Sequence, residues 1–219
     1  MPRQFNRPGR ARRVAGFTLV ELAIVLVIIG LIIGGVLTAQ QITQNARITS
    51  AIQGLKSVQA AAQSYHQNYG ALPGDDGGAS TRFGDKVPGS GDGNGMIGGG
   101  VTLQSTYNIQ GNNEGTFFWS HLRAAGLIKG NSQTPELLGN PFGGVYGVQN
   151  GAFSDGFALG VNVLCLDHAS GAAAQAIDQQ LDDGKPGSGN ILGGSNITGA
   201  KADNYNNANS NYILCTPLQ

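Results

Sequence analysis

The sequence predicts an α+β fold, in which a long N-terminal helix packs against a small C-terminal antiparallel β-sheet. Residues 17–37 are all apolar, Gly or Thr except for one glutamate. Residues 42–69 repeat apolar side chains every two to four positions, as an amphipathic helix does. The C-terminal half carries short apolar runs separated by Gly, Asn and Asp, a pattern typical of strands joined by turns.

The apolar run 17–37 is long enough to cross a membrane, because about 20 residues at 1.5 Å each span a hydrocarbon core of ~30 Å. Five arginines and no acidic residue precede it, so the N-terminus is expected in the cytoplasm and the chain after Leu37 is expected to be exported. A secretory signal peptide would have a shorter apolar region and a small-residue cleavage site. A plain signal anchor explains the arginines and the length, but gives no reason for Glu21.

The order of these features resembles a known family. A basic leader, then Gly16, then Phe-Thr-Leu-Val-Glu at residues 17–21 resembles the N-terminus of type IV prepilins and of type II secretion pseudopilins. The resemblance implies that a membrane-embedded prepilin peptidase removes the leader, residues 1–16, by cutting between Gly16 and Phe17. It also implies that the new amine of Phe17 is methylated.

In such proteins the helix first lies in membrane lipid and then forms the core of a filament. The resemblance implies that Glu21 serves in assembly by pairing with the Phe17 amine of a neighbouring subunit, which would offset the cost of burying a carboxylate. The implied partners are further copies of the chain in a helical filament, the prepilin peptidase and an inner-membrane assembly platform.

The long helix is expected over 17–69, because Gly70 suits the position after a helix and Pro73 cannot continue it. The stretch Tyr-Gly-Ala-Leu-Pro-Gly-Asp at this end resembles the segment after the helix in a branch of pilin-like proteins. Residues 70–219 are expected to form the globular head of a pilin fold. Its expected elements are a Gly-rich loop over 74–100, a helix over 114–128, strands within 145–166, a helix over 172–181 and a strand over 212–216.

The charge balance argues against a nucleic-acid-binding protein. The chain has 13 Lys and Arg against 13 Asp and Glu. Removal of the leader with its five arginines would leave eight basic and thirteen acidic residues, a net charge of −5. The rest of the chain has no Lys/Arg cluster, so no nucleic-acid partner is expected.

The two cysteines, Cys165 and Cys215, predict one disulfide, because an even and minimal count in an exported domain favours pairing. Closing a loop of this length, residues 165–215, would stabilise the fold by roughly 3–4 kcal/mol. The alternatives are two buried thiols, or a Cys165 nucleophile beside His168. The second would make the chain an enzyme, which the sequence does not favour: its three histidines have no metal-ligand spacing and no hydrolase motif is present.

A structural calcium ion is the one cofactor that the sequence suggests. Asp92 and Asn94 offer oxygen ligands two residues apart, and Asp75, Asp76 and Asp85 could complete the site. Some secretion pseudopilins hold calcium in a loop of the head. Asp-Gly pairs also occur simply because they make good turns, and that alternative stays open.

The sequence therefore predicts a structural subunit of a type IV pilus or a pilus-like filament. It would lie in the inner membrane with its C-terminus exported before assembly, and in an extracellular pilus or periplasmic pseudopilus afterwards. The alternatives are a pseudopilin of a type II secretion system and an exported binding module on a membrane stalk. The glycines at 30, 34 and 35 mark either close helix packing or a segment that melts on assembly.

Overall fold

The structure, a computed structural model, describes residues 16–98, 114–134, 136–206 and 211–218. Most of the predicted leader and the end of the predicted Gly-rich loop, residues 99–100, lie outside the described residues. The chain divides into two compact units, Met1–Thr43 and Gln44–Gln219. The boundary falls inside the first helix, so each unit is described separately.

Helix α1 runs from Leu19 to Tyr69. Within the first unit, its large apolar side chains are all exposed. Within the second unit, its apolar positions are buried at the spacing of an amphipathic helix, whereas Ile42 and Ala46, which belong to the same sequence pattern, are exposed. The helix ends as the sequence predicts: Gly70 adopts a φ of 69° and its N–H donates to the carbonyl of His66 at 2.8 Å.

The sheet of the second unit has five antiparallel strands in the order β1-β2-β3-β5-β4. The two central pairings are those of β3 with β2 and with β5, which confirms the small antiparallel sheet predicted for the head. The edge strands have only two and three residues, and their apolar content is too small to mark them in the sequence. The strands are β1 (Leu138–Gly139), β2 (Val145–Ala152), β3 (Phe157–Ala169), β4 (Leu192–Gly194) and β5 (Tyr212–Pro217).

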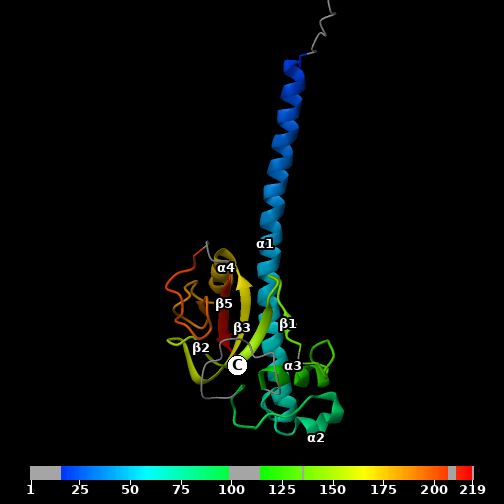
Figure 1. Ribbon diagram of the computed structural model, residues 1–219, viewed down its shortest axis with the longest axis vertical. Coiled ribbons are helices and arrows are strands. Elements are labelled where there is room, and N and C mark those ends of the chain that lie inside the picture. Colours follow the sequence, from blue (N-terminus) through cyan, green and yellow to red (C-terminus); the bar gives the residue numbers. More distant parts are fainter. Residues whose placement is uncertain (1–15, 99–113, 135, 207–210, 219) are drawn as a thin grey trace, which may run out of the picture. The chain divides into compact units, whose positions relative to one another are not determined.

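The two faces of the sheet bury different side chains, because successive residues of a strand point to opposite sides. Leu164 and Leu166 of β3 join the main core with the C-terminal part of α1. Figure 1 shows the sheet beside this part of the helix. Val163 and Cys165 join a smaller cluster on the opposite face. The sheet is thus covered on both sides.

Four shorter helices belong to the described part of the second unit. Helix α3 (Glu114–Ala124) buries Phe118, Trp119 and Leu122 in the main core. It ends four residues before the predicted limit, because Gly126 adopts a φ of 74° and the N–H of Leu127 closes on the carbonyl of Leu122 at 2.9 Å, as in a Schellman motif. The others are α2 (Ala79–Phe83), the short 3₁₀ helix η1 (Gly84–Lys86) and α4 (Gly171–Leu181).

Candidate functional site

The first candidate site is the start of α1. Gly16 and Phe17 are exposed and precede the first helical residue, Leu19. The bond predicted to be cut therefore lies in non-helical chain, outside the hydrogen-bonded turns of the helix. Phe17 itself is 83% exposed, so the described residues leave its side chain without a covering partner.

Thr18 and Glu21 form a reciprocal cap at this helix end. The N–H and the hydroxyl of Thr18 both donate to Oε2 of Glu21 at 2.8 Å, and the N–H of Glu21 donates to the Thr18 hydroxyl at 3.2 Å. This is the capping box of a Thr-x-x-Glu sequence. The length of the apolar run alone does not predict the capping role of Thr18. The Thr-x-x-Glu spacing of Thr18 and Glu21 does indicate it.

The helix beyond this cap is apolar on all sides. Among the described residues, α1 is the one helix long and apolar enough to cross a membrane, and its most apolar window has a mean hydropathy of 2.9. Among the described residues, a Cβ added at the glycines at 30, 34 and 35 would meet nothing within 4 Å, and the helix is continuous through them. The hydroxyl of Thr38 donates to the carbonyl of Gly34 at 3.1 Å. Within the first unit, the described residues leave this apolar surface uncovered.

The second candidate site is an acidic cluster between the loop after α1 and the start of α3. Carboxylate oxygens of Asp75, Asp92 and Glu114 lie within 4.8 Å of one another. Burial raises the pKa of Asp75 and of Glu114, although backbone N–H donors oppose the rise. Asp75 accepts from the N–H groups of Asn94 and Gly95, and Glu114 accepts from those of Asp92 and Gly98, all at 2.9 Å.

The structure brings together only part of the predicted calcium ligands. Asp76 is turned to Arg82 and to the hydroxyl of Tyr65, which donates to it at 2.6 Å. Burial opposes ionisation of Asp76, but these bonds and that from Gly78 lower its pKa. Asp85 lies in η1 and is not part of the cluster.

The side-chain amide of Asn94 donates to Asp92 at 2.8 Å, and its side-chain oxygen accepts the N–H of Met96. Glu114, which the sequence prediction did not include, joins the cluster. A calcium ion would be held here by carboxylates that already accept backbone donors, so calcium binding stays a prediction. A second acidic group lies at the end of α4 and consists of Asp178 within the helix and Asp182 and Asp183 just after it.

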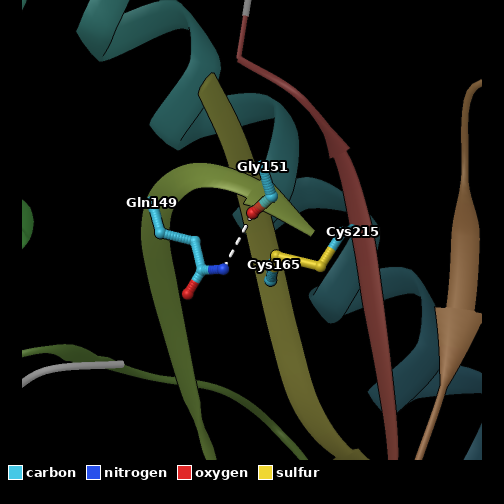
Figure 2. The surroundings of a disulfide bond; sticks show 4 residues. All are labelled: Gln149, Gly151, Cys165 and Cys215. Atoms are coloured by element: carbon cyan, nitrogen blue, oxygen red, sulfur yellow. Dashed lines mark hydrogen bonds between the residues drawn. A yellow bond between two sulfur atoms is a disulfide. The ribbon is translucent and has the colours of Figure 1, made fainter. Parts of the chain in front are cut away.

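The cysteines form the predicted disulfide. Cys165 of β3 and Cys215 of β5 face each other across the strand pair, with their Cα atoms 4.0 Å apart, and both are buried. Figure 2 shows the bond beside β2, where the side-chain amide of Gln149 donates to the carbonyl of Gly151 at 2.8 Å. Because both sulfurs are bonded, Cys165 cannot act as a thiol nucleophile beside His168 in this structure.

Comparisons with known proteins agree with the N-terminal features. The family model described as the prokaryotic N-terminal methylation motif matches residues 11–37. The solved structure of the major type IV pilin PilA1 from Clostridium difficile is 16% identical in sequence; the match covers 81% of this chain and 97% of that one, with a TM-score of 0.37. A search of curated proteins found no match. The resemblance expected from residues 16–21 is confirmed at the N-terminus: residues 11–37 of this chain carry the prokaryotic N-terminal methylation motif.

Proposed function

We propose that the chain is the structural subunit of a type IV pilus or a pilus-like filament. It is cut between Gly16 and Phe17, methylated on the Phe17 amine, and polymerised through the apolar helix of residues 17–37. The observation that carries the proposal is a methylation motif followed directly by a helix whose large apolar side chains are exposed all round. A helix of that kind needs lipid before assembly and identical neighbours after it.

The capping box explains how Glu21 tolerates both environments. Both bonds from Thr18 end on Oε2, which meets part of the carboxylate's hydrogen-bonding need inside the subunit. Glu21 is exposed, and its other oxygen, Oε1, can accept a donor from another molecule without breaking the cap. Cleavage after Gly16 would create such a donor, the methylated amine of Phe17 on a neighbouring subunit. A charged pair buried in this way costs far less than a lone carboxylate.

The disulfide and the sheet, which buries side chains on both of its faces, support a structural role for the head. Cross-linking β3 to β5 stabilises an exported domain without any dependence on a ligand. A subunit of this kind would sit in the inner membrane before assembly, where it meets the prepilin peptidase and the assembly platform. A pilus subunit and a type II secretion pseudopilin share this path and differ in whether the filament leaves the cell.

The test is mass spectrometry of the N-terminus, made on filaments sheared from cells and on the membrane fraction. The expected N-terminal peptide begins at methylated Phe17. The Glu21→Ala variant should stay in the membrane fraction and give no filaments, whereas Gln63→Ala, at an exposed position on α1 outside the apolar run, should assemble normally. Protein that begins at Met1 in every fraction would refute the processing. Filaments of Glu21→Ala in normal amount would refute assembly through this carboxylate. A wild-type chain that stays in the membrane fraction and forms no filaments would favour a membrane-stalked binding module.

A further inference from the structure

The segment after α1 is a packed layer over α3 despite its glycine content. At Gly74, φ is 91° and a Cβ would lie 2.5 Å from the carbonyl oxygen of Glu114. At Gly89 a Cβ would lie 2.6 Å from the ring of Phe117, and at Gly91 it would overlap the backbone of Asp75. Residues 74–98, here called the clasp loop, therefore lie directly on α3 and on their own first turn.

One buried side chain of α3 holds this loop at two separate points. His121 is fully buried, and its Nδ1 accepts the N–H of Gly74 at 3.0 Å. Its Nε2 lies 3.0 Å from the carbonyl oxygen of Gly89. Since Nδ1 accepts, the ring proton must be on Nε2, where it donates to Gly89. Both nitrogens are thus used by the neutral ring.

The ring has no freedom to exchange these partners. It stacks between Tyr65 of α1 and Phe117 of α3, with centroids 6.1 and 6.0 Å away and planes 15° from parallel in both cases. A 180° turn of the imidazole would keep the ring plane but place carbon atoms where the two nitrogens now contact Gly74 and Gly89. The two hydrogen bonds therefore fix both the orientation of the ring and its neutral tautomer.

We propose that His121 makes the clasp loop acid-sensitive: a second proton on its ring releases residues 74–98 from α3. The second proton can bind only at Nδ1, where the N–H of Gly74 already points. Two donors would then face each other, and the buried N–H of Gly74 would lose its acceptor. The loop can relieve this conflict by leaving α3, which exposes the ring to water.

The charged groups around the ring do not offset this conflict. Burial lowers the pKa of His121; Asp76 opposes the change and Arg82 adds to it, and these two groups are paired with each other. From α1, the hydroxyl of Tyr65 donates to Asp76 and stays protonated, since burial raises its pKa. Among the described residues, the carboxylates of Asp75, Asp92 and Glu114 also lie in the layer between the loop and α3.

The sign of the effect separates the histidine from these acids. A histidine whose pKa is lower in the closed loop than the ordinary 6.5 makes the open loop bind more protons, so closure weakens as the pH falls below about 6.5. Burial raises the pKa of Asp75 and of Glu114, so protonation of these acids favours the closed loop as the pH falls. A loss of closure on mild acidification therefore points to His121.

The test is amide hydrogen exchange of the full chain in detergent micelles between pH 7.5 and 5.0, corrected for intrinsic exchange rates and read by mass spectrometry. Protection of the clasp loop is expected to fall by up to tenfold per pH unit below about 6.5, whereas peptides from β3 keep their protection. His121→Gln should remove the pH dependence of the loop, and His168→Gln, at an exposed histidine on β3, should leave it unchanged.

Two results would overturn the proposal. One is loop protection in the wild-type chain that stays constant from pH 7.5 to 5.0, or that falls equally in β3. The other is a pH-dependent fall that persists in the His121→Gln chain. If that variant does not fold, the wild-type series decides alone, because only the loop should respond.

Discussion

Gly54 on α1 is predicted to be a contact position that no larger residue can fill. A Cβ built on Gly54 would lie 2.6 Å from Cζ of Tyr146 and closer still to its hydroxyl oxygen. Tyr146 of β2 is 2% exposed, and its hydroxyl donates to the carbonyl of Ala51 at 3.1 Å. Burial raises the pKa of Tyr146 to about 12, so the hydroxyl remains a donor at neutral pH. The glycine thus lets the sheet reach the helix.

The expected effect of Gly54→Ala follows from three contributions. On an open helix surface the change would stabilise by about 1 kcal/mol. Here the methyl group displaces Tyr146, which loses a hydrogen bond worth about 1 kcal/mol. Overpacking of the core costs a further ~1–3 kcal/mol. The net expectation is a destabilisation of about 1–3 kcal/mol, or a melting temperature lower by roughly 2–12 °C for a unit of this size.

The measurement is thermal unfolding of the full chain in detergent, followed by fluorescence of Trp119, the single and fully buried tryptophan. Gly35→Ala is the matched control, because it lies on the same helix with nothing within 4 Å of its added methyl group. The double variant of Gly54→Ala with Tyr146→Phe should lose less stability than the sum of the losses in the two single variants, since the hydroxyl is then absent. An unchanged or raised melting temperature for Gly54→Ala, or strict additivity, would refute the steric reasoning.

Three further predictions concern the cap, the disulfide and the acidic cluster. Thr18→Ala should weaken the helix start by about 1 kcal/mol and reduce filament yield, with Thr18→Ser near wild type, as sheared-filament yield would show. Replacing Cys165 and Cys215 together by Ala should lower the free energy of unfolding by about 4 kcal/mol in denaturant titrations, and an unchanged midpoint would contradict this. Millimolar calcium added after chelation should raise the melting temperature of the wild-type chain but not of Glu114→Gln; no shift in either would remove the metal site.

Elements with a strong local signal could be predicted from the sequence. The long helix follows from its continuous apolar pattern, and its end from the glycine at position 70. The end of α3 was set four residues too late, although Gly126 was a readable stop signal in the Ala-Ala-Gly-Leu sequence. Strand β3 is longer than expected because it continues through His168, which adopts a φ of 60° at a bulge.

The structure of the clasp loop could not be predicted in the same way. The composition predicts a loop over residues 74–98. The contacts that hold this loop in place come from α3, more than fifteen residues away in the sequence. The bonds from His121 to the loop span 47 and 32 residues. No periodicity or motif encodes such pairings, because they depend on which helix face meets the loop after both have packed. The same distance in sequence kept Glu114 out of the predicted acidic site.

Two glutamates show how far local reasoning reaches. Glu21 and Glu114 both lie in the first turn of a helix and both accept backbone N–H groups. The donor to Glu21 is three residues away, so the local sequence Thr-x-x-Glu predicts the capping role of Glu21. The donors to Glu114 are 22 and 16 residues away and belong to another element. One carboxylate organises its own helix and leaves an oxygen for a neighbouring molecule, whereas the other is occupied in holding a loop. Both carboxylates accept backbone N–H groups in the same way. The position of the donors in the sequence assigns Glu21 to assembly and Glu114 to the folding of the head.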